Sequence, residues 1–154
     1  VAAGGERWGL GAATLTIVAA PRPATITTHS EGESSAENDA SLLIRAEVDG
    51  LSLVVAGDAE ESTQTSHARL GAAVDADVLV VPHHGSRRHS VAFFDAVSPT
   101  VALISVGAGN DYGHPADSTV RAVTQTGARV FRTDEHGSIT VAPAPGGLSV
   151  TPQR

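Results

Sequence analysis

Hydrophobic and polar residues alternate in blocks along this chain, and the blocks predict strands interleaved with helices. Short apolar, β-branched runs predict strands at 14–20, 41–48, 51–56, 77–81, 100–106, 129–132 and 138–142. Stretches rich in helix formers predict helices at 59–73, 89–97 and 116–126. Asp49-Gly50, between two of the strands, is a strong β-hairpin signal. The pattern therefore predicts an α/β fold, with a mixed β-sheet and helices on at least one face.

Two polar segments bound this pattern. Residues 29–39 are rich in Ser and Glu and predict a solvated connection, while residues 143–154 form a Pro/Gly-rich tail that we expect to be frayed. We therefore assign the domain to residues 1–142. The longest apolar runs, 51–56 and 78–81, are far shorter than the roughly 18–20 residues that a membrane span needs. We expect no span within the chain, and a soluble segment.

Composition restricts the chemistry further. The 154 residues are 41% hydrophobic but only 3% aromatic, so Ala, Val, Leu and Ile must build the core. The absence of cysteine excludes disulfides and thiolate ligands, and seven histidines leave His and carboxylates as candidate metal ligands. The net charge of −7, with Arg as the only cationic side chain, makes general phosphate neutralisation weak. Any contact with nucleic acid must therefore be local.

Three loops with chemically active side chains each follow a predicted strand. They are Gly57-Asp58, the Pro-His-His-Gly-Ser loop at 82–86, and Gly113-His114-Pro115. Ligands of α/β sheets collect where strands end, so we expect the three loops to meet at one edge. A carboxylate and imidazoles meeting there suit Zn²⁺ or Mn²⁺.

Each candidate residue also has a structural interpretation. Asp58 with Glu61 three residues later can be a helix N-cap, and His114 can be a turn residue. His83-His84 can be a polar loop pair. Arg87-Arg88 can contact a phosphate or lie on a solvated loop. The other histidines are expected at the surface: His29, His67, His89 and His136.

Taken together, the loops and their flanking strands resemble a known protein family. The runs are NDASLLIRAEVDGLSLVVAGDAEE, DADVLVVPHHGSRRHS, PTVALISVGAGNDYGHPADSTV and GARVFRTDEHGSITV, covering residues 38–142 in unbroken order. They are similar to the C-terminal metallo-β-lactamase-like domain of ComEC-type competence proteins. The joint occurrence of the PHHGS, YGHP and RTDEHG elements makes this resemblance specific.

The resemblance implies a four-layer αββα sandwich of two similar halves, with a dinuclear metal site between them. Asp58 then matches the metal-bridging carboxylate, and His114 matches a late imidazole ligand. The pair His83-His84 supplies a further ligand and a general acid, for which we favour His84. Arg87 and Arg88 are the candidate substrate contacts.

The sequence departs from the family pattern in one respect. The signature His-x-(His/Asp)-x-Asp-His, which supplies most metal ligands, is absent, and His29 is the only histidine before Asp58. The chain therefore resembles the second half of the domain with one extra strand in front. It offers three metal ligands, an incomplete shell for two Zn²⁺ or Mn²⁺ ions.

The implied function is part of a DNA-uptake protein, as a metal-dependent, nuclease-like phosphodiesterase acting on incoming DNA. One alternative is a catalytically incomplete module that handles DNA or packs on a channel. Another is a hydrolase of the same fold acting on RNA or a small ester. The expected partners are DNA, the missing N-terminal half and a transmembrane channel region. The resemblance places the parent protein in the cell membrane, with this domain outside the cytoplasm.

Overall fold

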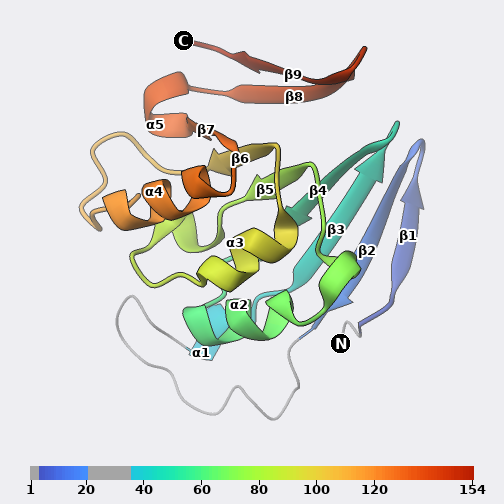
Figure 1. The fold of residues 1–154 in the computed structure, drawn as a ribbon, viewed down its shortest axis with the longest axis horizontal. Helices are drawn as coiled ribbons and strands as arrows, with labels where there is room; N and C mark the ends of the chain where they lie inside the picture. The colour runs from blue at the N-terminus through green and yellow to red at the C-terminus, as the bar shows by residue number, and fades with distance from the viewer. Residues whose placement is uncertain (1–3, 21–35) are drawn as a thin grey trace.

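A seven-stranded mixed sheet forms the centre of the computed structural model, which describes residues 4–20 and 36–154 (Figure 1). Neighbouring strands follow chain order from β1 to β7. The strands are β1 (Arg7–Leu10), β2 (Ala13–Ala19), β3 (Leu43–Val48), β4 (Leu51–Val55), β5 (Val78–Val80), β6 (Val101–Ile104) and β7 (Arg129–Arg132). The first four pair antiparallel, whereas β4, β5, β6 and β7 pair parallel. The predicted α/β class with a mixed sheet is confirmed.

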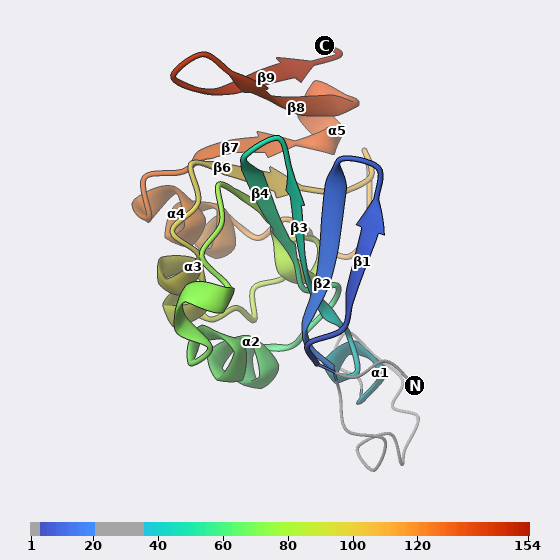
Figure 2. The same ribbon diagram turned by 90° about the vertical axis from the view of Figure 1, so that its right-hand side faces the viewer.

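Three helices cover one face of this sheet (Figure 2). They are α2 (Glu61–Ala68), α3 (Val91–Val97) and α4 (Asp117–Gln125), and the shorter helical elements are α1 (Ala36–Asp39), η2 (Gly71–Ala73), η3 (Pro82–Gly85) and α5 (Thr133–His136). Phe93 and Phe94 of α3 are fully buried against the aliphatic side chains of the parallel strands. One aromatic pair thus anchors a core otherwise built from small aliphatic residues.

The opposite face of the sheet is only partly covered. A separate hairpin of β8 (Ile139–Ala144) and β9 (Gly147–Pro152) lies over it (Figure 2), and packs around Leu51, Val78 and Val101. Toward β1 the same face carries apolar residues without such a cover. Trp8 there is 46% exposed, and Leu10 is exposed as well. One sheet and its helices are compatible with half of an αββα sandwich.

Several sequence expectations need correction. The tail from residue 143 is not frayed, because its second half pairs as β9 with β8. Residues 36–39, expected in a loop, form α1, and the rest of the predicted connection at 29–35 lies outside the described residues. Two strands rather than one precede β3, since β1 was not predicted. The predicted helix at 59–73 is broken into α2 and η2. None of the helices in the described ranges is long and apolar enough to cross a membrane.

Ser52 of β4 and Asp77, which directly precedes β5, form hydrogen bonds whose contribution to stability depends on pH. The Ser52 hydroxyl and backbone N–H both donate to Oδ2 of Asp77, at 2.7 and 2.8 Å, and these bonds hold the pKa of Asp77 below its ordinary value. A carboxyl whose pKa is lowered by folding stabilises the protein above its unfolded pKa, and that contribution is lost as the pH falls through the folded pKa.

We expect Ser52→Ala to lower the free energy of unfolding by about 1–3 kcal/mol at neutral pH. The substitution removes the charge-assisted hydrogen bond to Asp77 Oδ2 and the bond that the Asp77 N–H donates to the Ser52 hydroxyl. The deficit should shrink as Asp77 becomes protonated in acid. Urea unfolding of both proteins at a series of pH values measures this. A deficit that stays constant down to the acid range would contradict the assignment.

Candidate functional site

The three predicted loops do meet at one edge of the sheet. They follow β4, β5 and β6, which run parallel, so their carboxyl ends lie side by side. The backbone N–H of His83 donates to the carbonyl of Gly57 at 3.0 Å, and that of Ala116 donates to the carbonyl of Gly85 at 2.9 Å. The predicted convergence of the loops is therefore confirmed by direct hydrogen bonds between them.

The two adjacent histidines point in different directions. Both have left-handed backbone conformations, with φ of 50° at His83 and 53° at His84. As a result His83 turns into the protein and is buried, whereas the His84 side chain is 51% exposed. Nδ1–H of His84 donates to the carbonyl of Ser105 at 2.7 Å, which leaves Nε2 facing Asp58 Oδ1 at 3.6 Å. The two residues are thus fixed in separate environments, one inside and one at the surface.

Glu60 is a site residue that the sequence analysis missed. Its carboxylate is buried, accepts a hydrogen bond from Asn38 Nδ2 at 3.1 Å, and lies 3.7 Å from Nδ1 of His83. That nitrogen is buried without a hydrogen bond. A carboxylate beside an imidazole is an arrangement that orients histidine ligands of metals. In the sequence, two consecutive acidic residues at the start of a predicted helix, Glu60 and Glu61, could have indicated this site residue. Such residues indicate helix capping equally well.

The capping interpretation of Asp58 is wrong. Helix α2 begins one residue after Glu60, and its N-cap makes no side-chain hydrogen bond. Asp39 of α1 instead accepts hydrogen bonds from the Glu60 N–H and the Thr63 hydroxyl, at 3.3 and 2.6 Å. A carboxylate from another segment therefore binds the start of this helix. The Asp58 side chain, 45% exposed, is left available to the site.

His114 is held by its own loop. The side-chain amide of Asn110 donates to the His114 carbonyl at 2.7 Å, and its oxygen accepts from the His114 N–H at 3.2 Å. The His114 ring packs edge-on against His83, with centroids 5.6 Å apart, and is nearly parallel to the ring of Tyr112. His83 and His114 thus lie in contact, while Asp58 faces His84.

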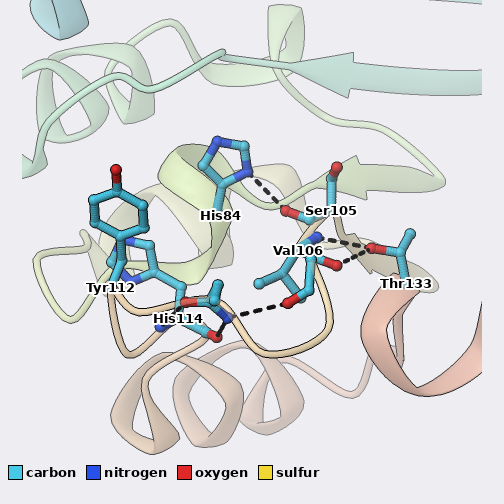
Figure 3. A pocket seen from close by; sticks show the side chains of 8 residues that line it. His84, Ser105, Val106, Tyr112, His114 and Thr133 are labelled. Atoms are coloured by element: carbon cyan, nitrogen blue, oxygen red, sulfur yellow. Dashed lines mark hydrogen bonds between the residues drawn. The ribbon is translucent and has the colours of Figure 1, made fainter.

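A cavity of about 410 Å³ opens beside these residues (Figure 3). His84, Asn110, Tyr112 and His114 line one part of it. The opposite wall is the end of β6, where the Thr133 hydroxyl accepts from the Val106 N–H and donates to its carbonyl, both at 2.7 Å. Thr133 begins α5 in the RTDEHG element, so this element fixes the cavity wall from a distant part of the chain.

Neither residue of the arginine pair lines this cavity. Arg87 and Arg88 are both exposed. Arg88 lines a second hollow, which it shares with Asp39, Glu60 and Glu61. The hollow also contains Arg69, so its three carboxylates outnumber its two guanidinium groups, which makes it a poor place for a phosphate. The predicted phosphate contact of the two arginines remains a prediction.

The predicted ligands do not form a complete metal shell on their own. Within residues 4–20 and 36–154, no group of three or more His, Asp or Glu side chains is placed to hold a metal ion. Asp58, His83 and His114 have suitable donor atoms, and Asp58 is half-exposed at the shared edge. The described chain alone therefore does not fit a two-metal centre, and further ligands would have to come from elsewhere.

The histidines expected at the surface differ in how deeply they are buried. His67 is buried against Phe93, and burial lowers its pKa, so the surface prediction is wrong there. His89 is half-buried, stacks on Phe94 and contacts the Thr119 hydroxyl at 2.9 Å. His136 is half-buried against Phe131. His29 lies outside the described residues.

Comparison with known proteins gives two competence proteins. ComE operon protein 3 of Bacillus subtilis is 32% identical over 108 residues, which cover 70% of this chain and 14% of that protein. Competence protein ComA of Neisseria gonorrhoeae is 33% identical over 121 residues, covering 77% of this chain and 18% of that protein. No family model matches. The chain spans less than a fifth of the length of these relatives.

Proposed function

Because this chain belongs to the family of ComEC-type competence proteins, we propose that it forms one half of a metal-dependent phosphodiesterase domain acting on incoming DNA. The parent protein then lies in the cell membrane and presents this domain outside the cytoplasm. The observation that carries the proposal is the convergence of Asp58, His83, His84 and His114 at one sheet edge. These residue types are the ones that phosphodiester hydrolysis with divalent metals uses.

The partly uncovered face of the sheet supports the proposal that a second half of the domain packs against it. Trp8 pairs with Leu15, which pairs with Ala46, and Ala46 pairs with Leu53, so these four apolar residues share one face. No helix of the described chain covers them; Leu53 packs against the cluster under the β8–β9 hairpin, and Trp8, farther along the face, is half-exposed. We infer that this partly exposed apolar surface is an interface. We assign it to the segment of the parent polypeptide that forms the other half of the sandwich and supplies the remaining metal ligands.

His84 is suited to the role of general acid. Its Nδ1–H is fixed on the Ser105 carbonyl, so Nε2 is presented at the surface of the site beside Asp58. A proton on Nε2 can pass to the leaving oxygen of a phosphodiester, since the side chain is half-exposed and reachable. Divalent metals, when bound, would activate a water and neutralise the phosphate. Asp58, His83 and His114 would contribute their carboxylate and imidazoles to that centre.

A second candidate function is a catalytically incomplete module that handles DNA. It is favoured by the lack of a three-ligand group in the described part of the chain. Both functions place the segment in DNA uptake, and they differ only in whether the assembled domain cleaves DNA.

The decisive experiment compares the 154-residue chain with a polypeptide that also contains the parent's preceding residues. We expect the longer polypeptide to hydrolyse a phosphodiester when Mn²⁺ or Zn²⁺ is present. This hydrolysis should stop when a chelator removes the metal. Calorimetric titration should show tight metal binding to the longer polypeptide and weak binding to the 154 residues. Stoichiometric metal binding without any hydrolysis of DNA would favour the incomplete module.

A further inference from the structure

An exposed aromatic ring stands at the rim of the cavity beside the candidate site (Figure 3). Tyr112 is 71% exposed, which is unusual for a large ring in a chain with few aromatics. One side of the ring faces His114, at a centroid distance of 6.2 Å and an interplanar angle of 21°. The other side is therefore open, and it can accept a second flat group in the same orientation.

The loop that carries Tyr112 is held in place. Asn110 binds the carbonyl and the N–H of His114, and its side chain also donates to the Gly107 carbonyl at 3.3 Å. These three bonds connect the two ends of the loop around Tyr112. A ring presented by a braced loop loses little conformational freedom when it binds a ligand, which favours affinity.

The cavity that Tyr112 helps to line has the size and lining of a small-molecule site. Its volume of about 410 Å³ falls within the range typical of ligand pockets, roughly 300–1,000 Å³. The Asn110 amide and the Thr133 hydroxyl, which line it, are already engaged by backbone groups. His84 and His114 also line it, with Val106 and Gly107, so apart from these two imidazoles the cavity offers flat, weakly polar surface with no Asp, Glu, Lys or Arg side chain.

We propose that this cavity, with the Tyr112 ring as its stacking surface, binds an unpaired nucleobase next to the phosphodiester that is cleaved. The proposal rests on the proposed function and adds to it a preference for single-stranded DNA. A base in a duplex is covered on both sides by its neighbours, so it reaches Tyr112 only after being extruded from the stack. With a net charge of −7, this chain gains little from phosphate contacts, and base stacking supplies the affinity instead.

The test is a titration of the parent polypeptide with a single-stranded oligonucleotide of about ten nucleotides that carries one 2-aminopurine. Stacking on Tyr112 should quench the 2-aminopurine fluorescence. Tyr112→Ala should weaken binding roughly ten- to hundredfold and remove the quenching, while Tyr112→Phe should keep both. Leu70→Ala, which shortens an exposed apolar side chain in the turn after α2, is the matched control and should bind as the unaltered protein does.

The same oligonucleotide annealed to its complement should bind less tightly to the unaltered protein, and Tyr112→Ala should reduce this discrimination. Equal binding of single-stranded DNA by Tyr112→Ala and the unaltered protein would overturn the proposal, even if hydrolysis still depends on Asp58. Tyr112-dependent quenching in a polypeptide that never cleaves DNA would instead keep the nucleobase site and overturn the proposed catalysis.

Discussion

Asp58→Ala in the parent polypeptide should reduce metal-dependent hydrolysis of DNA by at least about 100-fold. Even groups that only orient metal ligands typically cost about 10–100-fold in metal affinity or activity, and the Asp58 carboxylate is proposed as a ligand itself. It lies at the sheet edge where the three loops meet, 3.6 Å from Nε2 of His84. Loss of this single carboxylate therefore removes a proposed metal donor from the point where the loops meet.

The loss of activity can be separated from a loss of folding. Asp58 is half-exposed, and it caps no helix, because Asp39 binds the start of α2. Its removal should therefore change the free energy of unfolding by less than about 0.5 kcal/mol. The measurements are initial rates of hydrolysis and urea unfolding curves for the same preparations.

Asp58→Asn and Asp95→Asn are the matched comparisons for this experiment. The first keeps the shape of the side chain and removes its charge, so it should fail as Asp58→Ala does. The second removes the charge of an exposed carboxylate on α3, and it should leave hydrolysis unchanged. Full activity in Asp58→Ala would show that this residue is not part of the site, whatever the fate of the other variants.

Local sequence patterns predicted most of the sheet because those patterns act over a few residues. Asp49 and Gly50 have φ of 48° and 80°, the left-handed pair that a tight hairpin requires, and they join β3 to β4 as expected. Within the run at 77–81, Val78–Val80 form β5 between two parallel neighbours, and Val78 and Leu79 are fully buried. Strand β9 was not predicted, because the Pro and Gly residues of the tail indicate irregular structure locally, whereas its pairing with β8 stabilises it as a strand.

The candidate site was predictable only as far as it depends on loops that follow strands. Their convergence follows from parallel pairing, which the alternation of strands and helices indicates. The burial of Glu60 beside His83 was not predictable, because it depends on Asn38 and Asp39 of α1, about twenty residues away in the chain. The opposite directions of His83 and His84 likewise depend on left-handed backbone angles that no pattern of residue types encodes for histidine.

The contact between the second and third loops depends on one glycine. Gly85 has a φ of +80°, and a Cβ at this position would lie 2.6 Å from Cβ and 3.2 Å from Cα of Pro115. The backbone of Gly85 also accepts the hydrogen bond from Ala116. The His83-His84 loop and the His114 loop therefore approach each other so closely that there is no room for a side chain at Gly85.

Gly85→Ala should lower the free energy of unfolding by roughly 2–5 kcal/mol. A non-glycine residue at this φ costs about 1–2 kcal/mol, and overpacking against Pro115 adds about 1–3 kcal/mol. Relief of the clash has to move the two loops apart, which separates the His83 and His114 rings from their 5.6 Å contact. Hydrolysis by the parent polypeptide should therefore fall together with stability.

Gly109→Ala is the control that separates the cost of backbone strain at a positive φ from the cost of the steric clash with Pro115. Gly109 has a φ of +72° in the loop that carries His114, but a Cβ there would meet no atom within 4 Å. This variant should cost only the backbone strain of about 1–2 kcal/mol. Urea unfolding of both variants gives the difference, which measures the packing of Gly85 on Pro115. Equal destabilisation by the two substitutions would show that the loops are not in contact, and the site would then lack the geometry on which its proposed chemistry depends.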